Sequence, residues 1–282
     1  MRLGGPIFND AKDPKNWISE LRRLSYRAAY CPVSIDASHE VVQEFSRAAA
    51  QSDILIAEVG SWCNPLSSDI ETRKKSIERC IRSLDLAERI GAVCCVNISG
   101  SCGEQWDGPH PDNLTPATFQ KIVETTQKII DAVKPERAFY TLETMPWAYP
   151  DSLESYLELI EAIDRPQFAV HLDPANLINS PRKYYENGLM ISECFEKLGT
   201  RIKSCHAKDI LLSPRLTVHL DEVRPGLGNL DFRTFLRETS RLKADVPMML
   251  EHLPAQEEYA LAAEFIRGVL LEIETNEINS KQ

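Results

Sequence analysis

The chain has 282 residues with 42 acidic against 32 basic ones, a formal net charge of −10, and no basic run longer than Arg73-Lys74-Lys75. This acidic balance argues against a nucleic-acid-binding surface and against an anionic membrane as a partner. A chain of this length buries about three quarters of its unfolded surface, so one α/β barrel or two ordinary domains can enclose a large, dry site.

The N-terminus and the cysteines predict a soluble, cytoplasmic protein. The start, MRLGGPIFND, has no apolar run of signal-peptide length, and no window approaches about 18 uninterrupted apolar residues. The eight cysteines fall mostly inside apolar runs such as AVCCVNI, which favours reduced, buried thiols. Because no CxxC pair occurs, a structural zinc site made of thiolates is not expected.

Short apolar runs recur along the chain, and a segment with helical periodicity follows each of them. We predict strands buried on both faces at 1–5, 26–31, 53–59, 91–98, 138–143, 168–173, 202–206 and 247–251. We predict helices at about 14–23, 38–51, 67–90, 115–134, 151–164, 181–199, 230–243 and 256–273. Several have start signals, such as Thr115 before Pro116 and the pair Asp151-Ser152.

The regular alternation of strand and helix predicts an α/β fold with parallel strands, and eight such units in 282 residues indicate a single-domain (β/α)₈ TIM barrel. A doubly wound open sheet is the alternative, but no Gly-rich loop of the GxGxxG or GxxxxGK[ST] kind follows any strand. Since no linker or shift in composition interrupts the chain, we expect one barrel at 1–274 and a polar C-terminal tail at 275–282.

Residues 211–229, LLSPRLTVHLDEVRPGLGN, do not fit the simple repeat. The segment follows the seventh predicted strand and is too long for an ordinary connection to the next helix. Its alternating run LTVHLDEV is typical of one arm of a hairpin. Because long loops after barrel strands lie over the catalytic face, we expect an extended hairpin there.

The last four predicted strands each end in a residue that can bind a metal: Glu143, Asp173, His206 and Glu251. In a barrel, the carboxyl ends of neighbouring strands converge on one bowl. Each residue alone has a simpler explanation, such as a solvent-facing carboxylate, a turn residue or a core histidine. Four in succession favour one site, because unpaired buried carboxylates are costly without a cation. Three carboxylates and one imidazole favour a single Mn²⁺, Mg²⁺ or Co²⁺ ion, with Zn²⁺ left open.

A series of motifs, in this order and spacing, resembles the xylose-isomerase-like barrel superfamily of sugar and sugar-phosphate isomerases and epimerases: MRLGG, AERIGAVCCVNISG, ETMPW, HLDPANLI, HAKD, RPGLGNLDF and LEH. The resemblance spans almost the whole chain and implies the barrel and the same four metal ligands. It also implies metal-dependent proton transfer on a bound ketose or aldose through an enediolate. Glu143 and Glu251 would each bind the ion through one oxygen and act as base or acid with the other, from opposite faces of the substrate.

Other residues are expected to contact the substrate in such a site. Lys208 and Asp209 either contact substrate hydroxyls or orient the ligands, and the alternative is an exposed loop ion pair. Arg224, in the long loop, is placed to reach a substrate oxygen or phosphate. Trp62 and Trp147 are candidates for the apolar walls of the site, and the alternative is that they only pack under loops. Glu58 is a candidate for binding substrate hydroxyls.

Two positions near the aspartate ligand remain. Ketose 3-epimerases of this superfamily usually carry a histidine three residues after that aspartate, where this chain has Asn176. An asparagine can bond a hydroxyl but cannot carry charge, so this position departs from the pattern. His171 lies two residues before Asp173, shares its inward-facing side and is a further candidate for contact with the substrate. His219 and His252 are given no role.

Other functions compete with the isomerase hypothesis. The same site permits a lyase that dehydrates a keto-cyclitol or keto-sugar acid, in which the enediolate expels a β-hydroxyl. A phosphodiesterase like endonuclease IV shares the fold, but six histidines and a net charge of −10 suit neither a multi-zinc cluster nor DNA. A non-catalytic sugar-binding barrel would more often lack one of the four ligands. We therefore expect a small-molecule sugar as the partner, no nucleic acid and no membrane, and the sequence leaves a homo-oligomer open.

Overall fold

The computed structural model describes residues 1–9, 13–242 and 245–279 and forms the predicted barrel. Its strands are β1 (Arg2–Gly4), β2 (Ala28–Tyr30), β3 (Leu55–Gly60), β4 (Cys94–Asn97), β5 (Phe139–Glu143), β6 (Phe168–Leu172), β7 (Ile202–Ala207) and β10 (Pro247–Leu250). They are parallel and close on themselves in the order β1-β10-β7-β6-β5-β4-β3-β2. All eight lie within the segments predicted from the apolar runs, apart from the last residues of β3 and β7.

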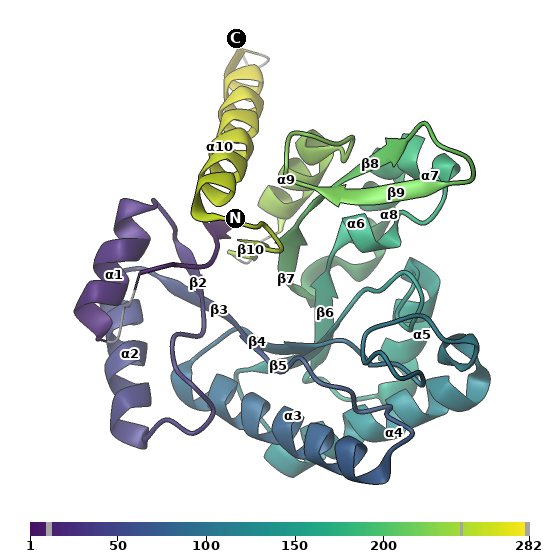
Figure 1. Cartoon of the computed structure of the whole chain (residues 1–282). Coiled ribbons are helices and arrows are strands. Elements are labelled where there is room, and N and C mark those ends of the chain that lie inside the picture. The colour runs from purple at the N-terminus through teal and green to yellow at the C-terminus, as the bar shows by residue number, and fades with distance from the viewer. Residues whose placement is uncertain (10–12, 243–244, 280–282) are drawn as a thin grey trace.

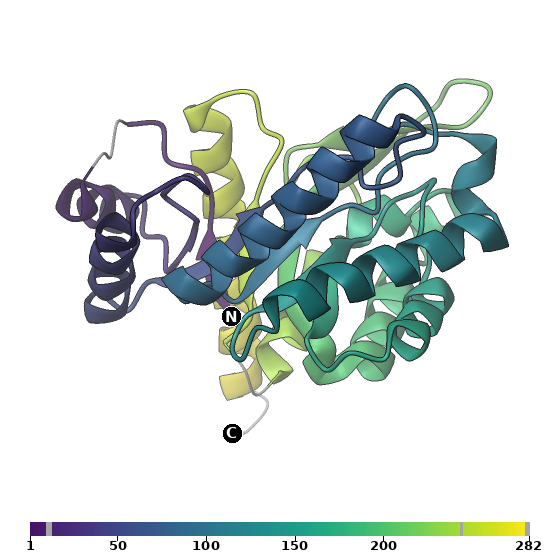
Figure 2. The same ribbon diagram turned by 90° about the horizontal axis from the view of Figure 1, so that it is seen from below.

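Helices form an outer layer around these strands (Figures 1 and 2). They are α1 (Pro14–Arg23), α2 (His39–Gln51), α3 (Ile70–Ile90), α4 (Pro116–Val133), α5 (Leu153–Ile163), α6 (Pro174–Leu177), α7 (Pro181–Tyr185), α8 (Asn187–Leu198), α9 (Phe232–Arg241) and α10 (Gln256–Asn279). Two short 3₁₀ helices, Pro111–Leu114 and Gly199–Arg201, complete the set. In Figure 2 the long helices α3 and α4 lie side by side along the outside of the barrel.

The predicted helix at 181–199 is divided into α7 and α8. The Asn187 side chain donates to the carbonyls of Tyr184 and Asn229 and accepts from the amide of Asp231. An asparagine that bonds nearby backbone in this way competes with a continuous helix. The same hydrogen bonds attach the region of α7 and α8 to the segment that precedes α9.

The C-terminal helix extends further than predicted. α10 continues to Asn279, so it runs into the stretch expected to be a polar tail. Residues 280–282 lie outside the described part of the chain, as does position 243, the expected end of the α9 segment. The boundary between barrel and tail stays a prediction. No helix among the described residues is long and apolar enough to cross a membrane.

The long segment after β7 contains the predicted hairpin, β8 (Asp209–Ser213) paired antiparallel with β9 (His219–Val223). It projects from the end of β7 beside the mouth of the barrel (Figure 1). Its first arm begins two residues earlier than the segment singled out in the sequence, because Asp209 already pairs with Val223. The hairpin thus starts directly at the end of the HAKD motif.

The apolar core lies mainly between strands and helices, where Trp17, Tyr156 and Phe235 are almost fully buried. Inside the barrel the apolar filling is small, a separate cluster of Ala28, Ala57 and Met249. Other buried side chains of the interior are polar, among them Glu58, His171 and His206. The barrel therefore holds its titratable groups in a buried layer beneath its mouth.

Candidate active site

Four strand ends bring four ligand-type side chains together. Each of Glu143, Asp173, His206 and Glu251 offers an atom within 4.8 Å of the others, and all four side chains are buried. His206 Nδ1 lies 3.1 Å from Glu143 Oε1 and 2.8 Å from Glu251 Oε1. The convergence follows from the barrel, in which β5, β6, β7 and β10 are consecutive neighbours.

Local hydrogen bonds aim the carboxylate of Asp173. It caps the N-terminus of α6, where its Oδ1 accepts from the amides of Ala175 at 2.9 Å and Asn176 at 3.4 Å. Thr144 exchanges two hydrogen bonds with the backbone of Asp173, donating from its hydroxyl at 2.8 Å and accepting at 3.1 Å. These contacts occupy one carboxylate oxygen and leave Oδ2 directed at the cluster.

A buried lysine lies against the same carboxylates. Lys208 Nζ is 2.7 Å from Asp173 Oδ2, 2.6 Å from Glu251 Oε1 and 3.4 Å from Glu143 Oε1. Burial opposes ionisation of Glu143, but the positive charges of Lys208 and His206 hold its pKa well below the ordinary value. Burial also opposes ionisation of Glu251, but the positive charge of His206 helps to lower the pKa of Glu251 to about 2.

The negative charge of the cluster exceeds what its cations balance. Burial, together with the neighbouring carboxylates, raises the pKa of Asp173 to about 7. Asp173 Oδ2 and Glu251 Oε1 are buried, and their close partners are charged groups: the Lys208 ammonium at 2.7 and 2.6 Å and, for Glu251, His206 Nδ1 at 2.8 Å. Three converging carboxylates beside one imidazole nitrogen form a donor set that suits a hard divalent cation. The cluster can therefore bind a metal ion.

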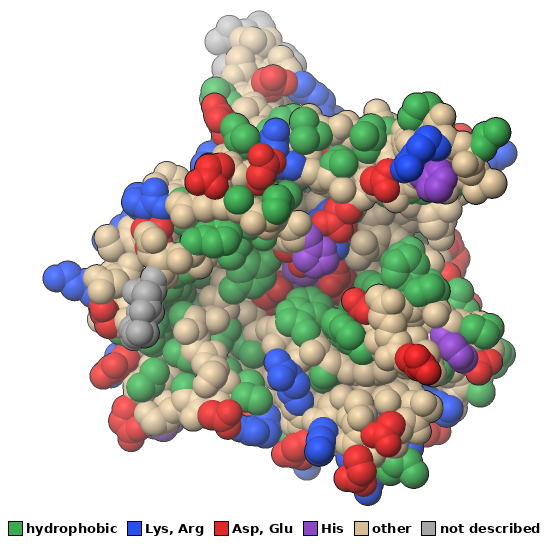
Figure 3. All heavy atoms as spheres, viewed as in Figure 1, with side chains coloured by type: hydrophobic (Ala, Val, Ile, Leu, Met, Phe, Trp, Pro, Cys, Tyr) green, Lys and Arg blue, Asp and Glu red, His purple; other side chains and the backbone are tan. Residues whose placement is uncertain are grey.

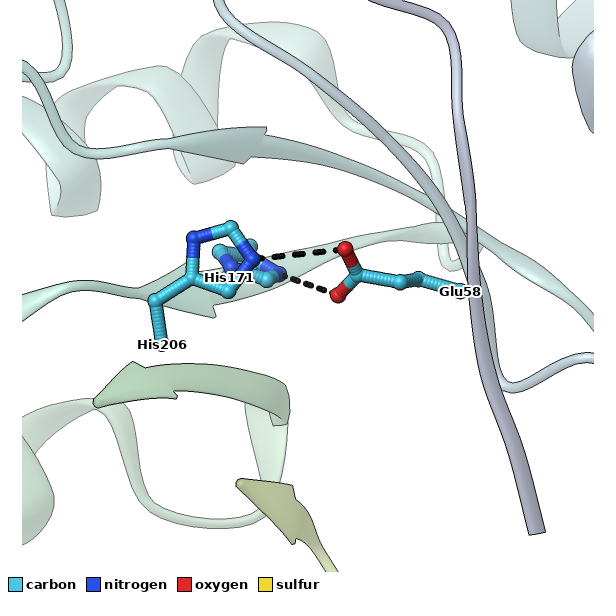
Figure 4. A group of neighbouring side chains, drawn as sticks. All are labelled: Glu58, His171 and His206. Atoms are coloured by element: carbon cyan, nitrogen blue, oxygen red, sulfur yellow. Dashed lines mark hydrogen bonds and ion pairs between the residues drawn. The ribbon is translucent and has the colours of Figure 1, made fainter. Parts of the chain in front are cut away.

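The Glu58 carboxylate faces the rings of His206 and His171 (Figure 4). Glu58, from β3, places Oε1 at 3.3 Å from His206 Nε2 and Oε2 at 3.6 Å from His171 Nδ1. The Glu58 carboxylate also accepts from the Ser204 hydroxyl at 3.1 Å. Burial lowers the pKa of His171 to about 4, so that ring is neutral. When His206 gives up its Nδ1 proton to bind an ion, the proton that stays on Nε2 is shared with Glu58, and the Nδ1 lone pair faces the cluster.

Glu58 and His171 do not line the cavity above the cluster. Both were expected to contact substrate, and the structure places them beneath His206, each at most 1% exposed. One carboxylate oxygen of Glu58 and one ring nitrogen each of His171 and His206 also lie within 4.8 Å of one another. Glu58 and His171 both contact the His206 ring, so they can fix its orientation.

We expect Glu58→Gln to weaken divalent-ion binding by about 10–100-fold, the usual effect of removing a partner behind a histidine ligand. The amide presents a donor as well as an acceptor to His206 Nε2 and so favours the wrong tautomer. Calorimetric titration with Mn²⁺ measures the change, and Ser204→Ala, which keeps the carboxylate, is the matched control. Unchanged affinity in Glu58→Gln would exclude this supporting role.

A cavity of about 520 Å³ opens above the cluster. Figure 3 shows the hollow, with histidine and acidic side chains inside it and hydrophobic side chains around it. Six of the predicted residues line the cavity: Trp62, Glu143, Trp147, Asn176, Lys208 and Glu251. Asn176 donates to Glu143 Oε1 at 3.2 Å and to the Thr144 carbonyl at 3.0 Å.

Trp62 owes its place to an unusual local backbone. It adopts a left-handed conformation at φ +33°, and its indole folds back over Gly60. A Cβ at Gly60 would lie 2.2 Å from Trp62 Nε1, so a larger residue there would displace the indole. The ring lies with its centroid 6.3 Å from that of His206. Trp62 therefore forms a wall of the cavity close to His206.

Several lining residues were missed in the sequence: Tyr30, Trp106, Asp107, Glu222, His252 and Tyr259. His252, given no role, follows Glu251 in a left-handed conformation at φ +57° and lies 3.2 Å from Glu222 Oε2. The signal that could have found Trp106 is the long polar loop after β4, because such loops in a barrel cover the catalytic face.

Asp209 and Arg224 were expected to contact substrate, and neither lines the cavity. The Asp209 carboxylate accepts the backbone amides of Ile210 at 2.8 Å and of Gly226, Gly228 and Leu230 at 2.9 Å each. Arg224 Nε instead donates to Glu258 Oε2 at 2.8 Å. Both side chains fasten the loop between β9 and α9.

Asp209→Asn should lower the free energy of unfolding by about 3 kcal/mol, because the amide nitrogen must face two backbone N–H donors whichever way it is turned. Urea denaturation measures the loss, and proteolysis should first cleave near residues 224–230. The exposed Asp221→Asn in β9 is the control and should change stability little. Equal stability of the two variants would contradict this structural role.

Comparison with known proteins agrees with this architecture. A family model described as "Xylose isomerase-like TIM barrel" matches residues 21–269. Endonuclease IV from Thermus thermophilus superposes with a TM-score of 0.73 at 17% identity, covering 96% of this chain and 100% of that one. D-Psicose 3-epimerase from Clostridium cellulolyticum, solved with D-tagatose, gives 0.65 at 13% identity, with 96% and 99% covered.

A xylose isomerase-like TIM barrel protein from Mycobacterium smegmatis, solved in complex with magnesium, gives a TM-score of 0.66 at 17% identity, covering 93% of this chain and 89% of that one. Identities this low show the fold alone. No curated protein matches the sequence significantly.

Proposed function

Because the chain belongs to the xylose isomerase-like TIM-barrel family, we propose that it is a divalent-metal-dependent isomerase or epimerase acting on a carbohydrate. The observation that carries this proposal is the pair Glu143 and Glu251, which reach one cavity from the ends of β5 and β10. β6 and β7 separate those strands, so the two carboxylates approach a substrate from different sides. A carbon held between them can lose a proton to one and gain a proton from the other.

The proposed ion site consists of Glu143, Asp173, His206 and Glu251. Three of its four donors are carboxylate oxygens, which favours Mn²⁺, Mg²⁺ or Co²⁺ over softer ions. When bound there, a divalent ion supplies positive charge that favours an enediolate over the parent carbonyl compound.

The residues of the chain supply the proton transfer and its control. Asn176 fixes the orientation of Glu143 by its hydrogen bond to Oε1. The Lys208 ammonium, 2.6 Å from Glu251 Oε1, favours the ionised form of that carboxylate, which is the form that accepts a proton. Trp62 covers the inner end of the cavity and keeps water from the reacting carbon.

Incubation of the Mn²⁺- or Mg²⁺-loaded protein in D₂O with ketoses, keto-acids and inososes tests the proposal, read by NMR. We expect deuterium uptake next to the carbonyl together with a new epimer or isomer. Loss of water without a new epimer would instead assign a dehydratase. No exchange with any substrate and either ion would contradict proton transfer altogether.

A further inference from the structure

The cavity has a surplus of negative charge at its surface. Four carboxylates line it, those of Asp107, Glu143, Glu222 and Glu251, against the Lys208 ammonium and the His252 imidazole. Both groups already have partners: Lys208 contacts the buried carboxylates of the cluster, and His252 lies 3.2 Å from Glu222 Oε2. Asp173 adds a further carboxylate directly below, so even a bound divalent ion leaves the site negative.

Nothing in the described part of the chain offers a phosphate or carboxylate group a free cation in this cavity. No arginine is among its described lining residues. Arg224, the residue in the long loop that was expected to reach a phosphate, is turned toward Glu258. Phosphate recognition requires charge-assisted donors such as an arginine fork or a helix N-terminus. An anionic substrate would therefore be repelled here.

Three tryptophans line the cavity. The exposed fractions of Trp62, Trp106 and Trp147 are 38%, 37% and 39%. Trp147 Nε1 donates to the Asp107 carbonyl at 2.7 Å, which joins the loops after β4 and β5. Trp106 and Trp147 thus stand on connected loops above the strand ends, whereas Trp62 lies next to the cluster.

The cavity has the volume and the aromatic lining of a site for a drug-sized ligand. A cavity of about 520 Å³ falls within the range of about 300–1,000 Å³ that binds drug-sized ligands through aromatic walls and a few polar groups. Large indoles left this exposed gain the most when a flat or apolar group covers them.

We infer that the substrate is an electrically neutral keto-sugar bearing a ring aglycone, that is, a glycoside and not a sugar phosphate or sugar acid. This inference rests on the proposed function. The keto-sugar ring lies over Glu143 and Glu251, and the aglycone ring lies against Trp106 and Trp147.

Three probes with the same keto-sugar core test the ligand class: the unsubstituted keto-sugar, its phenyl glycoside and its phosphate ester. With Mg²⁺-loaded protein and calorimetric binding, we expect the phenyl glycoside to bind about tenfold more tightly than the unsubstituted sugar, from the apolar area it covers. The phosphate ester should bind about tenfold more weakly, and added salt should reduce that deficit because it screens the repulsion.

Variants connect each preference to its residues. Trp147→Phe keeps an aromatic face and part of the phenyl preference, whereas Trp147→Ala and Trp106→Ala should bring the phenyl-to-unsubstituted affinity ratio close to one. Tyr185→Ala, an exposed aromatic on α7, is the matched control and should leave the ratio unchanged. Glu222→Gln should raise the affinity for the phosphate ester relative to the unsubstituted sugar.

The deuterium exchange of the same three probes separates the two proposals. Tighter binding of the phosphate ester, or equal binding of phenyl and unsubstituted sugars, overturns the neutral-glycoside inference even where exchange occurs. Tight phenyl binding without exchange in any probe overturns the proposed reaction and leaves the ligand class standing. Binding of none of the three overturns both.

Discussion

Glu143→Gln and Glu251→Gln should each lower net turnover by about 10²–10⁴-fold, the usual contribution of a positioned general acid or base. The amide keeps an oxygen that can bind the ion but cannot accept the proton. In an epimerase, each variant still exchanges the α-hydrogen of one epimer with solvent, because the remaining carboxylate removes and returns a proton on its own side. In an aldose–ketose isomerase, only one of the two variants is severely impaired.

The measurement is deuterium incorporation into each epimer by wild type and both variants, with bound metal determined in parallel. Glu257→Gln, an exposed acid at the start of α10, is the matched control and should behave as wild type. Wild-type turnover by both metal-replete variants would leave Glu143 and Glu251 as ligands only.

Exhaustive chelation should abolish activity and lower the melting temperature, because an ion that binds only the folded chain stabilises it. At an ion concentration of 100 Kd the stabilisation is about 2.7 kcal/mol, which corresponds to about 5–11 °C for a domain of this size. Titration should reach one ion per chain, as expected for one cluster of four ligand-type atoms open to the cavity.

Asp173→Asn provides the matched variant for the chelation experiment. Its amide oxygen can still cap α6 in place of Oδ1, while the charged Oδ2 that faces the cluster is lost. We expect the melting temperature of this variant to respond far less to the same ion concentration. Activity that survives chelation, with an unchanged melting temperature, would remove the metal from the mechanism.

The sequence itself determined the fold and brought out the four residues that we propose as metal ligands. Runs of apolar residues alternating with helical periods are local properties, and a closed parallel barrel is the arrangement that buries all eight runs. The barrel then converts position in the chain into position in space. Glu143, Asp173, His206 and Glu251 come together because strand ends meet, whatever their separation in sequence.

The alternation of side chains along an extended segment also distinguishes Lys208 from Asp209. Lys208 lies two residues after His206 and points to the same side, into the cluster, whereas Asp209 points away toward Gly226 and Gly228. A period of two predicts that difference. Treating Lys208 and Asp209 as equivalent neighbours of the histidine obscured it.

Only the tertiary structure decided how deep a side chain lies in the barrel and which way a loop side chain points. Glu58 and His171 face the interior as expected, but they lie one layer below His206 and are covered by it. Arg224 could have turned toward the cavity or toward Glu258, and the packing of its loop against α10 selected Glu258. The strands can be located in the sequence because each one is an apolar run, which is a property of that segment alone. A loop side chain takes its direction from partners distant in the chain, and only the folded molecule brings those partners into reach.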